Sequence, residues 1–424
     1  MKSVTIQRFM PDFQKIYVFD APASKSLMNR ALILAAFSDG DTLLRCGSFA
    51  EDTRAVLNCL ASLGISTDKR PDGIYVYGCG ENVPNKQARL NVMSAGTCAR
   101  FFPAVLSALG GDYFFDASDQ MKNRPMEFLS ELEKAGAQIE FYEKENSFPF
   151  RLRSKGFISK EFTADTDTST QYASALLLAG ALSKEPLSLT LTGSRTEGSY
   201  IKMTLSLLSA FGAEWSQNKN TVTVHSSTKP PKTFDVEADL SAACYFYALA
   251  LLFGIKVLVR RVKKNGFQGD IKFLELLEKR GVRFSETNEG LLADGSGIDS
   301  FEGFTENFCD FSDQTLTAAA LAPFASSLSR ITGIGHIKRQ ECDRIAAIEH
   351  NLNALGVHAV GGNDFIEIQP TLPGGGTVKT FHDHRVAMAF SLIGLKTGNL
   401  VIDDAECSDK TFEGYFKELN KLHV

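Results

Sequence analysis

The sequence has few of the features that mark secreted, membrane-spanning or nucleic-acid-binding proteins. Its 424 residues carry a formal net charge of −5, so no basic excess points to nucleic acid or a membrane surface as a partner. The eight cysteines form no CxxC pair and have no histidine at zinc spacing, so neither a disulfide framework nor a metal site is indicated. The apolar runs are too short to cross a bilayer, and residues 1–13 lack the apolar core of a signal peptide. We therefore expect a cytoplasmic protein with reduced thiols.

The composition that remains is typical of a globular protein. Hydrophobic residues make up 44% of the chain and charged residues 22%, and the length is sufficient for two domains with separate cores. Since the overall charge is slightly acidic, any binding site for an anion has to be built locally.

Residues 21–40 contain such a local site. Ser24, Lys25 and Ser26 stand where a helix begins, an apolar helix body follows at 31–37, and Gly40 marks its end. The N-terminus of a helix carries unpaired N–H groups and a partial positive charge, so a serine and a lysine placed there favour a bound anion.

The same design occurs six times along the chain. A small or polar start is followed each time by an Ala/Leu-rich helix, and successive starts lie 70 to 75 residues apart. This regularity indicates an internal repeat. The six segments begin at Ser24, Ser94, Ser169, Ser241, Ser312 and His382.

Each copy predicts a β-α-β-α-β-β module with a buried first helix and an amphipathic second helix. Three modules make a domain, so we expect an α/β (α+β-like) fold of two globular domains. Pro230 and Pro231 break both helix and strand between the third and fourth copies. We therefore predict one domain at 20–232, a second at 1–19 plus 233–424, and a hinge near 19–21 and 228–236. The N-terminal strand at 5–8 is assigned to the second domain.

Eight motifs along the chain resemble those of the EPSP synthase family (3-phosphoshikimate 1-carboxyvinyltransferases) and occur in the same order. The resemblance covers the whole chain. Each motif alone is a weak signal, whereas eight in the right order are a strong one. The motifs lie at 22–30, 94–100, 123–126, 169–171, 237–246, 341–344, 383–390 and 407–416.

The resemblance implies the enolpyruvyl transferase fold, with the buried helices pointing their N-termini at a cleft between the domains. It also implies transfer of the enolpyruvyl group from phosphoenolpyruvate to the 5-hydroxyl of shikimate 3-phosphate, as part of aromatic amino-acid biosynthesis, without a metal or cofactor. Both substrates are polyanions, for which helix N-termini and Lys or Arg side chains are suitable partners. We expect a monomer with no nucleic-acid or membrane partner.

The resemblance also assigns the binding residues. An isolated Lys or Arg would be read as a solvated surface charge, and an isolated Ser or Thr at a helix start as an N-cap, so these roles depend on the motifs. For phosphoenolpyruvate they are Gly96, Arg124, Gln171, Arg344, Arg385 and Lys410. For shikimate 3-phosphate they are Lys25, Ser26, Arg30, Ser169, Thr170, Gln171, Tyr200 and Asp313.

Addition and elimination require one proton at the methylene carbon and removal of another from the attacking hydroxyl. By resemblance Glu341 acts at the methylene carbon, Asp313 is the base towards the hydroxyl, and Lys25 assists proton transfer. Without the motifs, Asp313 would be read as a first-turn acid of an apolar helix, and Glu341 as a solvated loop charge.

Two positions depart from the family pattern, and both concern the acceptor phosphate. Gln340 stands where the family usually has a lysine, and Glu197 lies just before Tyr200. Two alternatives therefore stay open: enolpyruvyl transfer to another acceptor such as a UDP-sugar, and a non-catalytic homologue that binds anions. Residues 110–121 contain no cysteine, which counts against the UDP-sugar family.

Overall fold

The computed structural model describes residues 2–49, 51–124, 126–225, 228–264 and 266–424. Its contacts divide the chain into two compact units, which are described separately below. Unit 1 consists of Met1–Pro22 and Glu237–Val424, and unit 2 of Ala23–Val236.

Unit 2 contains three four-stranded sheets, each with one parallel pair and two antiparallel pairs. The first has the order β14-β3-β5-β4, with strands Thr233–Asp235, Thr42–Arg45, Gly73–Val76 and Thr67–Arg70. The second has the order β6-β7-β9-β8, with strands Gln87–Asn91, Gly111–Asp116, Phe150–Ser154 and Gln138–Phe141. The third has the order β10-β11-β13-β12, with strands Glu161–Asp165, Leu187–Thr192, Thr221–His225 and Glu214–Asn218.

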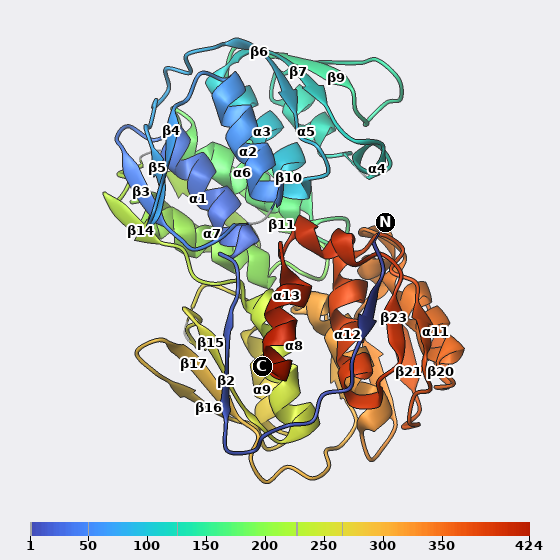
Figure 1. The fold of residues 1–424 in the computed structure, drawn as a ribbon. Coiled ribbons are helices and arrows are strands. Elements are labelled where there is room, and N and C mark those ends of the chain that lie inside the picture. The colour runs from blue at the N-terminus through green and yellow to red at the C-terminus, as the bar shows by residue number, and fades with distance from the viewer. Residues whose placement is uncertain (1, 50, 125, 226–227, 265) are drawn as a thin grey trace. The chain divides into compact units, whose positions relative to one another are not determined.

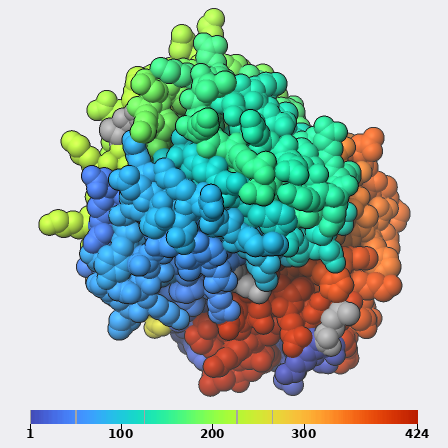
Figure 2. All heavy atoms as spheres, turned by 90° about the horizontal axis from the view of Figure 1, so that it is seen from above, coloured from blue at the N-terminus to red at the C-terminus, as the bar shows by residue number. Residues whose placement is uncertain are grey.

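The first helices of the three copies, α1 (Lys25–Phe37), α3 (Gly96–Leu109) and α6 (Thr170–Leu182), pack against one another inside unit 2 (Figure 1). Their side chains are buried nearly all round, as the apolar sequences predict. Figure 2 shows one face of this unit, in blue to green, as a closely filled surface. The remaining helices are α2 (Glu51–Ser62), α4 (Asp119–Lys122), α5 (Leu129–Lys134) and α7 (Ser199–Ala210).

Unit 1 contains two four-stranded sheets and one three-stranded sheet. The first has the order β16-β17-β15-β2, with strands Arg283–Glu286, Gly290–Asp294, Lys256–Arg260 and Ile16–Asp20. The second has the order β18-β19-β21-β20, with strands Thr305–Asn307, Ser329–Thr332, Phe365–Ile368 and Ala359–Gly361. The third has the order β1-β23-β22, with strands Val4–Ile6, Leu400–Ile402 and Gly376–Val378.

The buried helices of unit 1 are α8 (Leu240–Phe253), α10 (Thr315–Leu321) and α12 (His384–Thr397), which pack against one another. A 3₁₀ turn, η1 (Ser312–Gln314), leads into α10. The helices of the second type are α9 (Ile271–Glu278), α11 (Arg344–Ala354) and α13 (Tyr415–Leu419). The other 3₁₀ turns are η2 (Ala322–Phe324), η3 (Gly335–Arg339), η4 (Ala405–Lys410) and η5 (Asn420–His423).

Two strands connect the copies in an unexpected order. β2 precedes the first copy in sequence but pairs in parallel with β15 of the fourth, whereas β14 precedes the fourth copy and pairs in parallel with β3 of the first. Each unit thus contains one strand from a segment that connects the two units. This strand is β2 in unit 1 and β14 in unit 2.

The last copy is also shorter than the β-α-β-α-β-β pattern predicts. Its helix α12 is followed by β23, which pairs with the N-terminal strand β1 in a three-stranded sheet. Helix α13 and turn η5 follow β23, and the described part of the chain adds no fourth strand to this sheet. The chain thus closes the sixth copy with its own N-terminal strand.

Candidate functional site

In unit 1, six charged side chains form what we call the charged cluster: Asp313, Glu341, Arg344, Asp383, Arg385 and Lys410. Arg344, the first residue of α11, is its centre, because its guanidinium contacts all three carboxylates of the cluster. Its side chain is 1% exposed. Its Nε donates to Oδ2 of Asp383 at 2.7 Å and its Nη2 to Oδ1 at 3.3 Å, so the guanidinium is held by a fork of two hydrogen bonds. Asp383 is itself fully buried and caps α12 by accepting from the backbone N–H of Arg385 at 2.9 Å.

The outer edge of the same guanidinium faces the two candidate catalytic carboxylates. Nη1 of Arg344 donates to Asp313 Oδ1 at 3.1 Å, and Nη2 donates to Glu341 Oε2 at 3.0 Å. Burial opposes the charge of Arg344, but the carboxylates of Asp383, Glu341 and Asp313 together outweigh that cost and raise its pKa above the ordinary value.

Each of the two carboxylates contacts a second cation. Arg385 Nη2 donates to Asp313 Oδ2 at 2.8 Å, and Lys410 Nζ lies 3.5 Å from Glu341 Oε1. The side chains of Asp313 and Glu341 are 16% and 11% exposed, so both remain accessible at their outer edges. The charges of the cluster balance, and an incoming anion can bind Arg344, Arg385 and Lys410 only by competing with these carboxylates.

A further carboxylate, Asp270, is buried in unit 1 near Asp313. It accepts hydrogen bonds from Ser241 Oγ at 2.7 Å and from Gln314 Nε2 at 3.1 Å. Burial, together with the negative charge of Asp313, raises the pKa of Asp270 to about 6.

This shift predicts a pH-dependent cost of folding. The folded state holds the proton of Asp270 more tightly than the unfolded state does. Proton binding therefore stabilises the folded protein fully below about pH 4, and this stabilisation is lost as the pH rises through about 6. We expect Asp270→Asn, which stays neutral, to gain up to about 3 kcal/mol relative to the wild type between pH 4 and pH 7. Urea denaturation at both pH values measures this, and a constant difference between the two proteins would contradict it.

In unit 2, the starts of α1, α3 and α6 lie close together. Asn29 Nδ2 on α1 donates to Thr97 Oγ1 on α3 at 2.7 Å. A Cβ atom added at Gly96, the first residue of α3, would lie 3.1 Å from Arg124 Nη1 and 3.4 Å from Gln171 Oε1 on α6. Gly96, Arg124 and Gln171 are therefore in mutual proximity, and three positive helix ends are gathered in this part of unit 2.

Lys25 and Ser26 form the first turn of α1, as the sequence predicts. The N-cap is Ser24, whose side chain makes no capping hydrogen bond. Lys25 Nζ lies 3.2 Å from Asp52 Oδ2 on α2, and Asp52 is buried. No pattern in the sequence indicates this pair, because the two residues belong to different helices.

Arg30 is 1% exposed, and its guanidinium donates three hydrogen bonds to residues of unit 2. Nε donates to Thr204 Oγ1 at 2.8 Å, Nη2 to Ser174 Oγ at 3.0 Å and Nη1 to the carbonyl of Ser26 at 2.8 Å. Burial lowers its pKa to about 10. Arg30 thus joins α1 to α6 and α7, and the edge of its guanidinium supports the backbone of Ser26.

Ser169 caps α6 by accepting from the N–H of Gln171 at 3.2 Å, and Thr170 is the first residue of that helix. The loop before α7 lies against it, because a Cβ at Gly198 would be 3.5 Å from Thr170 Cγ2. Tyr200 is the second residue of α7, and its ring faces the guanidinium of Arg30 at 5.8 Å.

The two departures from the family pattern have defined partners. Gln340 Oε1 accepts a hydrogen bond from Arg344 Nη1, so this side chain folds onto the charged cluster. Glu197 pairs with Lys202 at 3.1 Å and accepts from Gln217 Nε2 at 3.1 Å, and the hydrogen bond from Lys202 lowers the pKa of Glu197. The negative charge of Glu197 is thus largely compensated by its neighbour.

The predicted site residues fall into two sets. Unit 1 gathers the predicted Asp313, Glu341, Arg344, Arg385 and Lys410 in the charged cluster. Unit 2 holds the predicted residues at the starts of α1, α3, α6 and α7, together with Arg124. Pro125, in the motif at 123–126, lies outside the described residues. Sequence reasoning assigned no role to Asp52, Asp270 or Asp383, although Asp383 stands in a motif two residues before Arg385.

Two features are absent from the residues that the structure describes. In residues 2–49, 51–124, 126–225, 228–264 and 266–424, no three or more His, Cys, Asp or Glu side chains are grouped so as to hold a metal ion. Across the same ranges, no helix combines the length and apolar character needed to cross a bilayer.

Comparison with known proteins points to one family. The family model described as EPSP synthase (3-phosphoshikimate 1-carboxyvinyltransferase) matches residues 17–419. The 3-phosphoshikimate 1-carboxyvinyltransferase of Nostoc punctiforme is 36% identical over 402 residues, which is 94% of each chain. That of Vibrio atlanticus is 32% identical over 433 residues and covers both chains completely.

Solved structures show the same fold. An EPSP synthase from Acinetobacter baumannii superposes with a TM-score of 0.82 at 24% identity, covering 100% of this chain and 98% of the other. The enolpyruvyl transferase NikO from Streptomyces tendae has a TM-score of 0.73 at 14% identity, covering 99% and 96%. The expected enolpyruvyl transferase fold is therefore confirmed, and the chain belongs to the EPSP synthase (3-phosphoshikimate 1-carboxyvinyltransferase) family.

Proposed function

We propose that this protein transfers the enolpyruvyl group of phosphoenolpyruvate to the 5-hydroxyl of shikimate 3-phosphate and releases phosphate. The observation that carries this proposal is the charged cluster, in which Asp313 and Glu341 each contact two cations. Such an arrangement provides two carboxylates for proton transfer and three cations for an anionic substrate.

The proposed donor site uses cations with planar geometry where a carboxylate binds. Arg344 and Arg385 present guanidinium forks to the carboxylate of phosphoenolpyruvate, and Lys410 adds a third charge. Gly96, Arg124 and Gln171 of unit 2 supply an N–H group at a helix start, a cation and an amide for its phosphate. Because Gly96 has no side chain, no Cβ crowds Arg124 and Gln171 at the start of α3.

The proposed acceptor site lies on the residues of α1, α6 and α7. Ser26, with Arg30 behind it, receives the carboxylate of shikimate 3-phosphate, and Ser169 and Thr170 receive the 3-phosphate at the start of α6. Gln171 and Tyr200 complete the set, and Lys25 assists proton transfer.

The proposed reaction is an addition followed by an elimination. Glu341 gives a proton to the methylene carbon of phosphoenolpyruvate while Asp313 accepts the proton of the 5-hydroxyl, whose oxygen bonds to the adjacent carbon. Glu341 then takes back a proton from the methyl group to restore the double bond, and the phosphate leaves with the proton that Asp313 accepted from the hydroxyl. Both carboxyl groups thus return to their starting protonation states.

We further propose two domains at 20–232 and at 1–19 plus 233–424, with hinges near 19–21 and 228–236. The two compact units divide the chain a few residues further on, after Pro22 and after Val236, so β14 lies in unit 2. The protein acts as a monomer in the cytoplasm, where phosphoenolpyruvate is available.

The acceptor is tested by measuring phosphate release from phosphoenolpyruvate with different acceptors. We expect release with shikimate 3-phosphate and none with a UDP-sugar or with phosphoenolpyruvate alone. Release with a UDP-sugar alone would reassign the acceptor. Binding of phosphoenolpyruvate without release in any mixture would favour a non-catalytic homologue.

Gly96→Ala gives a prediction for the donor side. A methyl group at this position would lie 3.1 Å from Arg124 Nη1 and 3.4 Å from Gln171 Oε1, so both groups have to shift by a few tenths of an ångström. We expect KM for phosphoenolpyruvate to rise roughly 10-fold, since about 1.4 kcal/mol of contact energy corresponds to that factor. Initial-rate kinetics measure this, with Gly374→Ala as control, because a Cβ at Gly374 would lie 3.6 Å from its nearest neighbour, the carbonyl oxygen of Leu355, which is an ordinary van der Waals contact. An unchanged KM would argue against a phosphate at Gly96.

A further inference from the structure

Asp270 is a buried carboxylate that the proposed reaction does not use. It is the N-cap residue of α9, is 8% exposed, and directs both oxygens into the interior of unit 1. Buried carboxylates are costly unless hydrogen-bonded donors surround them, so its position requires an explanation.

Its two hydrogen bonds join two helix starts. Oδ2 accepts from Ser241 Oγ in the first turn of α8, and Oδ1 accepts from Gln314 Nε2 in turn η1. Gln314 directly follows Asp313, the proposed base. A movement of Gln314 would therefore move the backbone that carries Asp313.

Gln314 has no freedom to compensate for the loss of this contact. Its side chain is fully buried, its Oε1 accepts from Thr317 Oγ1 at 2.9 Å, and its Nε2 also contacts the carbonyl of Ser241 at 3.4 Å. Without Asp270, Nε2 of Gln314 would retain only the long contact to that carbonyl.

The charged and titratable groups that face Asp270 are Asp313 in η1, Arg385 in α12 and Cys244 in α8. Arg385 is also hydrogen-bonded to Asp313, so Asp270 and Asp313 share the field of one guanidinium. Asp270 thus acts on the proposed base both through hydrogen bonds and through charge.

We propose that Asp270 is a positioning residue for Asp313, which it holds in place by fixing the side chain of Gln314 against the start of α8. This inference rests on the proposed function for its kinetic consequence, but its structural content, a fixed η1 turn, is independent of activity.

The kinetic test compares Asp270→Ala with Asp270→Asn. The alanine variant loses both hydrogen bonds, and we expect kcat to fall about 10- to 100-fold with KM for phosphoenolpyruvate nearly unchanged, because a displaced base affects chemistry more than donor binding. The asparagine variant can accept from Gln314 and donate to Ser241 Oγ, so it restores most of kcat. An asparagine variant as slow as the alanine variant would overturn the proposal, as would an alanine variant with wild-type kcat.

A double-mutant cycle locates the path of the effect. Gln314→Leu should lower kcat to a similar degree, and adding Asp270→Ala should lower it little further, because both changes break the same link. Additive losses would contradict a path through Gln314. Ser329→Ala is the matched control, since it removes another buried hydrogen bond of unit 1, that of the Phe304 N–H at 3.0 Å, and should leave kcat unchanged.

Hydrogen–deuterium exchange distinguishes this inference from the proposed function. In Asp270→Ala, the amides of 311–317 should exchange faster than in the wild type and in Ser329→Ala. Faster exchange in a protein whose wild type releases no phosphate would support the positioning role and refute the activity. Unchanged exchange at 311–317 would refute the positioning role even if the enzyme is active.

Discussion

Replacing Glu341 by glutamine should lower kcat about 10²- to 10⁴-fold, which is the range expected for loss of a general acid and base. The amide can still accept a hydrogen bond from Arg344, so the cluster keeps its geometry while the proton donor is lost. KM for phosphoenolpyruvate should change far less than kcat. Steady-state phosphate release at saturating concentrations of both substrates measures the effect.

The matched control for this change is Glu349→Gln. It makes the same chemical change at a residue of helix α11 that lies outside the charged cluster. We expect its kcat to equal that of the wild type. A Glu341→Gln variant that retains more than about one tenth of the activity would remove Glu341 from the proton-transfer step.

Replacing Arg344 by methionine should have the largest effect on stability. The guanidinium is buried and contacts Asp313, Glu341 and Asp383, so its loss leaves buried carboxylates without their cation. Breaking a buried ion pair in this way typically costs about 3–5 kcal/mol. Because protonation removes the unpaired charge, the difference from the wild type should shrink as the pH is lowered.

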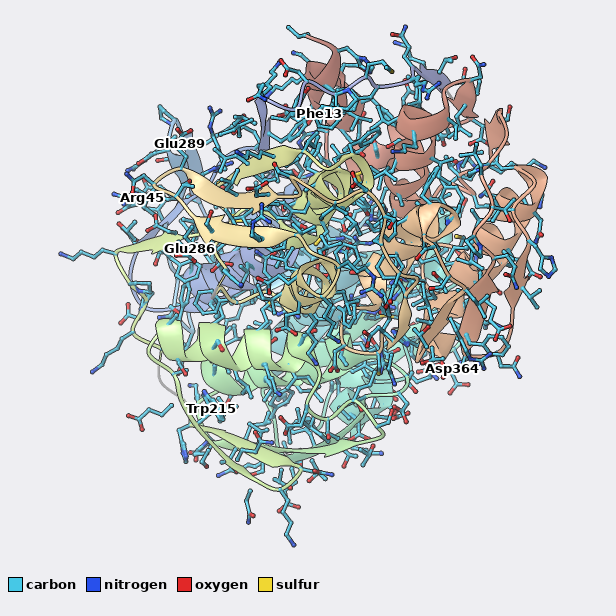
Figure 3. All side chains as sticks on the ribbon, turned by 90° about the horizontal axis from the view of Figure 1, so that it is seen from below. Phe13, Arg45, Trp215, Glu286, Glu289 and Asp364 are labelled. Carbon is cyan, nitrogen blue, oxygen red and sulfur yellow. The ribbon has the colours of Figure 1, made fainter. Side chains whose placement is uncertain are left out.

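The loss is measured by urea denaturation followed by far-UV circular dichroism. The single tryptophan, Trp215, lies on β12 of unit 2 (Figure 3), so its fluorescence follows that unit and not the one that contains the mutation. Arg283→Met serves as control, because Arg283 forms an exposed pair with Asp294 at 3.1 Å, and such a pair contributes less than about 1 kcal/mol. Equal losses in the two variants would contradict the central position of Arg344.

Much of the fold could be predicted from the sequence because it depends on local patterns. The apolar character of segments such as 240–253 requires burial on all sides, and the spacing of the six starts fixes the order of the modules. Details of helix starts were less predictable. Asp239, and not Ser241, caps α8 by accepting from Ala242 N–H at 2.9 Å, while Ser241 instead binds Asp270.

The sheets that β2 and β14 join could not be predicted, because no local pattern states which sheet an isolated strand joins. β2 has the alternating burial of an ordinary strand, yet its partner β15 lies 240 residues further along the chain. Parallel pairing of this kind is decided by tertiary contacts and not by propensity.

The motifs predicted which residues belong to the site but not which side chains hold them. Asp383 and Arg344 are 39 residues apart, and nothing in the sequence shows that a carboxylate in one motif fixes the guanidinium of another. Lys25 and Asp52 are a similar case, as are Asp270 and Gln314. In each pair, the partner is selected by the packing of helix starts, which single-sequence patterns do not encode.

The proposed function requires transfer of the enolpyruvyl group to one acceptor, shikimate 3-phosphate. Phosphorus NMR of the purified protein with phosphoenolpyruvate and shikimate 3-phosphate tests this most directly, since donor, acceptor, product and released phosphate are observed together. We predict that the donor signal disappears as inorganic phosphate and a new 3-phosphate ester appear in equal amounts. A donor signal that persists, or phosphate released without a new ester, would contradict the account.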